Sequence, residues 1–450
     1  MKWEVRTMRS GTSFFDWTVF KKTVCRYWPL WGAYFAIWLI TLPLSGVMIL
    51  QRAASLPGDN NVYSYTWEFA VQDVPAQALS LGLPLAVAFG ALCATAVFSH
   101  LYNARSANFF GGLPVRREGL FLTHYLAGLA FLIVPNLVIC LLTLLVEAAG
   151  GYVCWPTLGF WLAVTCGEGF FFYSLAVFCG LFTGHLLALP MFYGIVNVLA
   201  IGITELFAVV LRGFYYGFAG LTEGVYTVVK WLTPAAHLGE AVRMEAVHGT
   251  SSGSYPQELL DHVESIGGIW FWEDGYAAYI TVHGLDVVGV YAIAALLLTV
   301  GAFFLYRARR LESAGDVVSV KAMRPVFQYG VAFCAGLALG MLTTMFLGGG
   351  EIVLMTAILV WGVIGYFAAR MLLDKTFKVF GRWKGGLAVA AVFAALFCVV
   401  GFDLTGFETR IPDPAKVDRV ELYGLYAVHL GDSGDGFQQE LDDPEHIHLV

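Results

Sequence analysis

Charge is scarce in this sequence. Only 13% of its 450 residues are charged, 58% are hydrophobic, 15% are aromatic, and the mean hydropathy is +0.70. An ordinary soluble domain carries about 25% charged residues, so the composition excludes that class and predicts an integral membrane protein. The net charge of -7 decides little, because the placement of each sign matters more in a membrane protein than the total.

Motifs of nucleotide and metalloprotease chemistry are also lacking. The chain contains no GxxxxGK[ST] loop, no HExxH and no GxGxxG, so it is not expected to bind ATP through a P-loop of its own. The GDSGDG at 431–436 resembles a serine-protease motif, but it stands in a polar tail and is interpreted as a turn. These absences predict that the chain is not an enzyme and holds no cofactor of its own. We also expect no nucleic acid among its partners.

Cysteine and histidine form no metal or disulfide pattern. The sequence has 8 cysteines without a CxxC, and Cys154 lies at a predicted external turn as a candidate free thiol. The others that fall inside apolar runs are interpreted as small apolar filler, and they are Cys93, Cys140, Cys166, Cys179, Cys334 and Cys398. Three histidines of the external loop fit no zinc spacing and are interpreted as surface residues, and they are His248, His262 and His283. No metal site is predicted.

What the chain does have is long apolar runs. A run of about 20 residues crosses the hydrocarbon core of a bilayer as a helix. Runs of this length are expected near 29–50, 78–99, 120–146, 157–182, 187–210, 286–305, 327–347, 351–372 and 385–402. The predicted fold is therefore an all-α polytopic membrane protein with about nine transmembrane helices.

The positive charges predict the orientation of these helices. If the N-terminus is inside, the inside loops hold 19 of the 26 lysines and arginines, and such a bias is typical of the cytoplasmic side. We therefore expect the N-terminus inside, the C-terminus outside, and a multi-pass protein of the cytoplasmic membrane. The connection 183–185 carries no lysine or arginine. Residues 207–233 are apolar enough for a tenth span, but an external or re-entrant helix is preferred because a tenth span would turn the acidic loop 234–285 cytoplasmic.

Four regions follow from this topology. Residues 1–28 form a cytoplasmic N-terminus. Its aromatic residues recur at three- and four-residue steps, which indicates a helix lying in the membrane interface or, equally well, the water-exposed end of the first span. Residues 29–305 hold six spans, with an external segment at 211–285, and residues 306–402 hold three additional spans. Residues 403–450 are polar and predict the start of a small external α+β tail from a truncated domain, with a strand over 417–426 and a helix beginning at Asp443-Pro444.

The loop between the second and third spans, at 100–119, combines arginines with a Phe-Phe pair and helix breakers. This combination of residues is typical of a short helix on which a cytosolic partner could dock. The positive-inside rule gives the simpler explanation of the same arginines.

Ionisable residues inside spans are costly and are candidates for function. The polar candidates are Glu147, Glu168, Glu205, His185 and Asn197. Glu168 is the most central, and a functional carboxyl and a buried structural carboxyl are equally compatible with its position. Ala332, Gly336 and Gly340 form a small-residue stripe in the seventh run, which predicts close helix packing within or between chains.

Four segments of the sequence resemble the type-2 ABC transporter permeases of Gram-positive bacteria, in particular the large Ytr-like permeases with extra C-terminal spans. They are FKKTVCRYWPLWGAYFAIWLITLPL at 20–44, FSHLYNARSANFFGGLPVRREGLFLTHYLAGL at 98–129, FFFYSLAVFCGLFTGH at 170–185 and FDLTGFETRIPDP at 402–414. The resemblance implies that 1–28 contains a connecting helix and that 100–119 is a coupling loop seated in an ATPase. It assigns coupling to Arg105, Ser106, Asn108, Phe109, Leu113, Pro114, Arg116 and Arg117.

The resemblance implies the permease subunit of an ABC transporter. ATP would act through a separate ABC ATPase subunit, a second permease would complete a homodimer or heterodimer, and lipid would surround the spans. The alternative is a membrane anchor or sensor that presents an external domain without transport. An intramembrane enzyme would need a polar catalytic set, and only Glu168 lies at that depth.

Overall fold

The structure is a computed structural model of the chain. It describes residues 15–54, 60–112, 116–151, 153–215, 218, 220–248, 269–272, 278–309, 318–320, 323–348, 350–404, 406, 420–423 and 438–441. The predicted helix start at 443–444 and the predicted coupling residues Leu113 and Pro114 lie outside this part of the chain.

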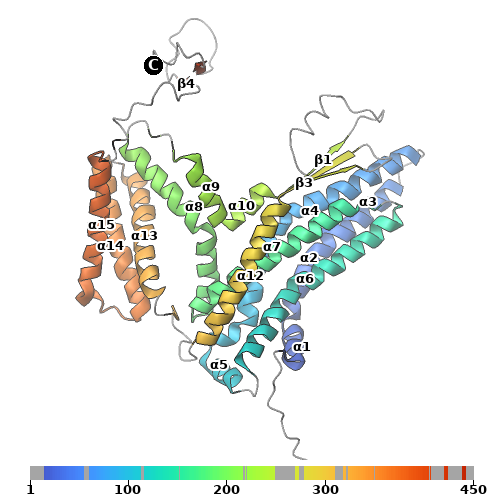
Figure 1. Ribbon diagram of the computed structural model, residues 1–450, viewed down its shortest axis with the longest axis horizontal. Coiled ribbons are helices and arrows are strands. Elements are labelled where there is room, and N and C mark those ends of the chain that lie inside the picture. Colours follow the sequence, from blue (N-terminus) through green and yellow to red (C-terminus); the bar gives the residue numbers. More distant parts are fainter. Residues whose placement is uncertain are drawn as a thin grey trace, which may run out of the picture.

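Helices dominate the fold (Figure 1). The first half of the chain forms α1 (Trp17–Arg26), α2 (Trp28–Leu39), α3 (Ser45–Ala54), α4 (Asn60–Val97), α5 (Ala104–Gly111), α6 (Arg117–Ala149), α7 (Trp155–Phe182) and α8 (Ala188–Phe214). The second half forms α9 (Glu223–Leu232), α10 (Pro234–Ala241), α12 (Leu285–Ala308), α13 (Met323–Leu347), α14 (Glu351–Asp374) and α15 (Trp383–Gly401). A π-helical turn at Ile40–Leu44, which contains Pro43, joins α2 to α3 in one span.

Nine of the described helical segments are long and apolar enough to cross a membrane. They are Trp28–Arg52, Val74–Val97, Arg117–Ala149, Trp155–Phe182, Ala188–Phe214, Leu285–Ala308, Met323–Leu347, Ile352–Asp374 and Trp383–Gly401. Each overlaps one predicted run, so the all-α polytopic fold is confirmed. The protein is a multi-pass membrane protein.

The segment expected to be an external or re-entrant helix forms no tenth span among the described residues. The fifth span continues to Phe214, and then α9 and α10 follow with 10 and 8 residues. A helix of 10 residues is about 15 Å long and cannot cross the hydrocarbon core.

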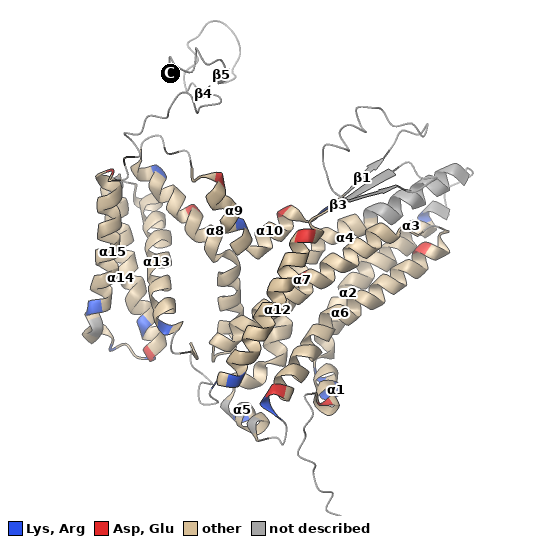
Figure 2. Ribbon diagram, in the orientation of Figure 1, with Lys and Arg blue, Asp and Glu red and all other residues tan. Residues whose placement is uncertain are grey.

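Connections at opposite ends of the spans define two faces of the molecule (Figure 1). The α5 face carries α1, α5, the end of α12 and the turn between α14 and α15. The sheet face carries the strands β1 (Arg243–His248), β2 (Ile269–Trp272) and β3 (Ala278–His283), together with α9 and α10. Figure 2 shows lysine and arginine where α6 begins and where α12 ends, on the α5 face.

The sheet was not anticipated in the external segment. Its strands pair antiparallel in the order β1-β3-β2, with Arg243 opposite His283 at one end of the ladder. Strands of four to six residues give too short an alternation to stand out beside long apolar runs. In the tail, β4 (Val420–Tyr423) pairs antiparallel with β5 (Gln438–Leu441), and β4 lies inside the predicted strand.

The spans divide into two bundles (Figure 1). The first bundle comprises α1 to α12 and shares one hydrophobic core, in which Trp38 and Trp161 are fully buried with ring centroids 4.9 Å apart. The second bundle comprises α13, α14 and α15 and has a smaller core. Helix α8 lies between them and contacts the second bundle through its C-terminal turns, where the rings of Phe214 and Phe397 are 5.9 Å apart.

Glycines set the helix distance in the second bundle. A Cβ atom on Gly340 would lie 2.8 Å from Cα of Ile358, and one on Gly336 would lie 3.0 Å from the Ile358 carbonyl oxygen. Ala332, one turn earlier, is fully buried. The small-residue stripe of α13 therefore faces α14 of the same chain, where it allows close backbone approach.

Candidate functional site

The short helix α5 projects from the end of the second span. Its N-cap is Asn103, whose Oδ1 accepts a hydrogen bond of 3.0 Å from the backbone N–H of Arg105. It ends at Gly112, whose N–H bonds the carbonyl of Asn108. Asparagine at the N-cap and glycine at the end are typical helix boundaries, so the local sequence fixes an eight-residue helix.

The two phenylalanines of α5 have opposite roles. Phe110 is half-buried, and its ring centroid lies 4.8 Å from that of His100 and 5.6 Å from that of His124. Phe109 is 67% exposed and contacts Phe110 edge to face. One ring therefore anchors the helix to the first bundle, and the other is presented at the surface.

The anchor is a buried histidine pair. The rings of His100 and His124 stack with centroids 4.6 Å apart, and both side chains are buried. Nδ1 of His100 lies 3.2 Å from the carbonyl oxygen of Val97, which can only accept, so Nδ1 carries the proton. Burial lowers the pKa of His100 to about 4, which keeps this histidine neutral at physiological pH.

Arg309, at the C-cap of α12, connects the end of α12 to the end of α7 and to the segment that follows α4, at the base of α5. Its guanidinium donates to the carbonyls of Gly180 and Leu181 at the end of α7 at 3.4 and 3.5 Å, and to the carbonyl of Leu101 at 3.4 Å. It also lies over the ring of Tyr102 at 5.7 Å. A cation at helix C-terminal carbonyls is favourable because those carbonyls carry partial negative charge.

His100, Tyr102, His124 and Arg309 meet at the base of α5, and we call this meeting point the α5 junction. Further hydrogen bonds attach neighbouring elements to it. The Tyr102 hydroxyl donates to Gly180 O at 3.0 Å, and the Tyr27 hydroxyl lies 3.0 Å from that of Ser99. The backbone N–H of Asp16, at the start of α1, donates to Thr123 of α6 at 3.1 Å. The segment 99–102 at the base of α5 is therefore bonded to the ends of α1, α7 and α12, and α5 itself contacts α6 through Phe110 and His124.

The predicted coupling residues do not all lie together. Arg105, Asn108 and Phe109 are exposed on α5, and Ser106 is partly exposed there. Arg116 and Arg117 lie at the start of α6 and are exposed. Nη2 of Arg117 donates to the carbonyl of Arg309 at 3.0 Å, so this arginine already has a contact within the chain. The surface presented by α5 consists of Arg105, Ser106, Asn108 and Phe109.

Glu168 lies deep in the contact between α7 and α4. Its side chain is 2% exposed, and Oε2 has no hydrogen-bond partner among the described residues. The carboxyl packs against Gly82, where an added Cβ would lie 3.2 Å from Oε2. The lack of a side chain at Gly82 thus leaves the space that the Glu168 carboxyl occupies.

The other polar candidates divide between buried and exposed positions. Glu147 is buried, and its Oε2 accepts from the backbone N–H of Cys154 at 3.2 Å. Cys154 is buried at the N-cap of α7 and forms no disulfide. Asn197 is buried and donates to Tyr193 O at 2.9 Å. Glu205 and His185 are exposed.

A hydroxyl cluster inside the first bundle was missed by sequence reasoning. The Tyr125 hydroxyl lies 2.6 Å from Ser174 Oγ and 2.7 Å from Thr299 Oγ1, so it joins α6, α7 and α12. Tyr173 packs beside it and donates to the Tyr125 carbonyl at 3.1 Å. Single hydroxyls in apolar runs give no pattern, because only the helix packing brings them together.

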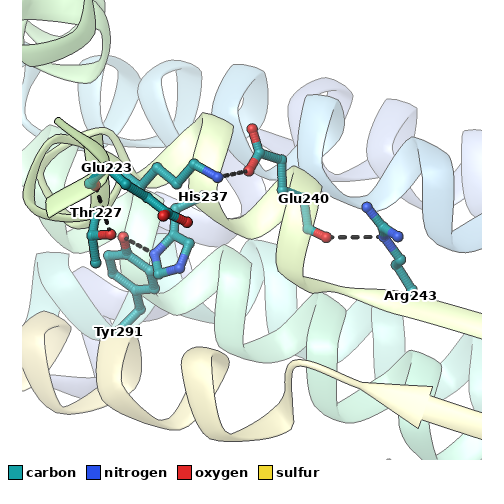
Figure 3. Close-up of polar contacts among 7 residues, drawn as sticks. Glu223, Thr227, His237, Glu240, Arg243 and Tyr291 are labelled. Carbon is teal, nitrogen blue, oxygen red and sulfur yellow. Dashed lines mark hydrogen bonds and ion pairs between the residues drawn. The ribbon is translucent and has the colours of Figure 1, made fainter. Parts of the chain in front are cut away.

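A second polar cluster lies on the sheet face (Figure 3). His237 Nδ1 lies 3.1 Å from the Tyr291 hydroxyl, which donates to the carbonyl of Trp231 at 3.1 Å. Lys230 and Glu240 form an ion pair of 2.8 Å beside them. These contacts hold α9 and α10 against the start of α12. Among the described residues, no three His, Cys, Asp or Glu side chains are placed to share a metal ion.

Comparison of the chain with family models, curated proteins and solved structures found no match. The fold therefore defines the class, a multi-pass helical membrane protein, and the geometry of the site has to carry the functional argument.

Proposed function

We propose that this protein is the permease subunit of an ABC transporter, that the α5 face lies in the cytoplasm, and that α5 is the helix on which a separate ATPase docks. The observation that carries the proposal is the pairing of Phe109, 67% exposed, with Phe110, seated on the histidine pair. On α5 the exposed ring of Phe109 stands beside the exposed side chains of Arg105 and Asn108, and aromatic and arginine side chains are enriched at protein interfaces.

The junction beneath α5 supports a mechanical role. Arg309, Tyr102 and the histidine pair connect the base of α5 to the ends of α4, α6, α7 and α12. A partner that closed on ATP and pushed α5 would therefore rotate or tilt four spans together, which is the kind of rigid-body step used in alternating access. The substrate would cross the bilayer without covalent chemistry by this chain.

The test uses the full chain co-expressed with a candidate ATPase subunit, that is, a chain with a GxxxxGK[ST] loop encoded by a neighbouring gene. Phe109→Asp combined with Arg105→Glu should lower the amount of ATPase that co-purifies about tenfold or more, because exposed aromatic and arginine side chains dominate binding at interfaces. The matched control is Phe377→Asp, since Phe377 is 83% exposed on the same face in the second bundle and should leave association unchanged. Retention of the ATPase by the α5 variant would exclude α5 as the docking helix.

Sidedness is tested separately in intact cells. A cysteine placed at Asn108, in a background with Cys25→Ser and Cys398→Ser to remove the two exposed native thiols, should resist a membrane-impermeant maleimide until the membrane is opened. Labelling from outside would overturn the cytoplasmic assignment. Absence of any ATPase partner, with a protected Asn108→Cys, would favour the membrane anchor or sensor.

A further inference from the structure

A groove on the α5 face lies between the start of α6 and the end of α12. Its volume is about 580 Å³, and it is lined by Arg116, Arg117, Glu118, Phe303 and Arg307. The charged side chains lie at the two helix ends, and the apolar ring belongs to the penultimate turn of α12. Figure 2 shows these charged helix ends side by side. The groove is distinct from the exposed surface of α5.

The lining favours an anion. Three guanidinium groups face one carboxylate, and the Glu118 carboxylate is only loosely engaged, 3.7 Å from Nε of Arg307. An ion pair of this length between partly exposed side chains contributes little, so Arg307, 65% exposed, can turn towards another acceptor. Arginine matches the geometry of phosphate oxygens through two parallel N–H donors.

The backbone adds to this preference. Helix α6 is 33 residues long and begins beside the groove, and its N-cap residue, Arg116, makes no side-chain cap. The first N–H groups of a helix carry partial positive charge, and an anion near them is stabilised. The guanidinium groups and the helix start thus favour the same sign of ligand.

The apolar part of the groove continues along α12. Leu296, Val300, Phe303 and Arg307 follow at steps of four, three and four residues in the helix, so they lie along one stripe. Leu296 is 57% and Val300 47% exposed, and the ring of Phe303 is fixed edge to face against Phe121, 5.9 Å away. This apolar stripe therefore runs from the arginines towards the middle of the α12 span.

We infer that this groove binds the phosphate of an anionic membrane phospholipid, with the headgroup between Arg116, Arg117 and Arg307 and an acyl chain along the Leu296–Val300–Phe303 stripe. The groove lies at the ends of two membrane-length helices, where headgroups meet the hydrocarbon core, and basic pockets between spans bind anionic headgroups for this reason. A free phosphate would satisfy the arginines but would leave the stripe without a role.

The experiment titrates the purified full-length chain in detergent, without ATPase, with dioleoylphosphatidylglycerol and with zwitterionic dioleoylphosphatidylcholine. Bound lipid is counted by native mass spectrometry. The wild type should retain the anionic lipid preferentially, and Arg116→Gln combined with Arg307→Gln should lower its affinity roughly 30-fold, at about fivefold for each arginine. The matched control, Lys378→Gln combined with Lys384→Gln, removes two exposed charges from the same face of the second bundle and should retain wild-type binding.

Two further measurements keep the outcomes decisive. Inorganic phosphate and glycerol phosphate should compete only weakly, and displacement of the lipid by either at the same concentration would show a free-anion site and overturn the lipid assignment. Equal retention of both lipids, or unchanged binding in the double variant, would overturn the lipid assignment too.

If the double variant fails to fold, Arg307→Gln alone replaces it, because that side chain is mostly exposed. The α5 variant should bind the lipid normally, so failure of ATPase docking and failure of lipid binding are separable.

Discussion

The two bundles bury different kinds of side chain. Among the described residues, the first bundle buries two histidines, two glutamates, two asparagines and several hydroxyls, whereas the second bundle buries one polar side chain, Gln328. The second bundle instead brings its backbones together through glycines, as where Gly340 meets Ile358. Buried polar groups are costly in a membrane and need hydrogen-bonding or charged partners. Glycine contacts need only that the two helix surfaces fit together closely.

This difference assigns different roles to the bundles. Some of the costly groups of the first bundle lie at the α5 junction, at the hydroxyl cluster and at Glu168, and others, such as Glu147 and Asn197, lie elsewhere in the bundle. The second bundle holds itself together by packing and meets the first through α8. Under the proposed function, the first bundle would be the part that responds to the ATPase, and the second would be the part that stays rigid. Three experiments test this contrast.

The largest effect is expected in the second bundle. Gly340→Ala would place a methyl group 2.6 Å from Cγ1 and 2.8 Å from Cα of Ile358, and because backbone cannot move aside, the change should cost about 3 kcal/mol. Hydrogen exchange should rise in α13 and α14 while α7 stays protected. The control Gly330→Ala has open space within 4 Å on the same helix and should be neutral. Equal exchange in both bundles would contradict their independence.

The next effect is a loss of stability of the α5 junction at acid pH. Burial lowers the pKa of His100 from 6.5 to about 4, so between these values the unfolded chain binds a proton that the folded chain excludes. Stability is therefore complete above about pH 6.5 and falls as the pH drops towards 4, by about 2 kcal/mol at pH 5.

His100→Phe should make this pH dependence shallower by removing the contribution of His100, because the ring still packs between Phe110 and His124 but no longer titrates. Thermal melts between pH 7 and pH 4.5 measure the difference. The same exchange at exposed His185 should keep the wild-type profile. A wild-type profile in the His100 variant would show that the junction does not govern acid stability.

The smallest effect concerns the hydroxyl cluster. Tyr125→Phe removes the hydroxyl that lies between Ser174 and Thr299 and should destabilise the first bundle by about 1 kcal/mol, since interhelical hydrogen bonds in membranes are modest. Thr356→Val in the second bundle removes a hydroxyl that bonds only carbonyls of its own helix and should change nothing in a melt. A larger loss from Thr356→Val would reverse the contrast between the bundles.

Sequence reasoning located every span because apolar length is a local property. It also located the α5 region, since the arginines, the Phe-Phe pair and the helix breakers of 100–119 lie close together in the sequence. It could not separate Phe109 from Phe110, because which ring faces the bundle depends on where His100 and His124 meet. It missed Arg309 altogether, since an arginine at the end of a span is what the positive-inside rule predicts for any loop.

The sequence by itself determined that the described part of the chain carries nine helices long and apolar enough to cross a membrane, because about 20 consecutive apolar residues have only one favourable environment and one way to satisfy their backbone. The tertiary structure alone decided which helices touch. Hydroxyls, glycines and arginines acquire their roles only when residues separated in the sequence, such as Arg309 and Leu101, come into contact. The spans follow from local hydrophobicity, whereas the α5 junction and the arginine groove follow from contacts that no local pattern encodes.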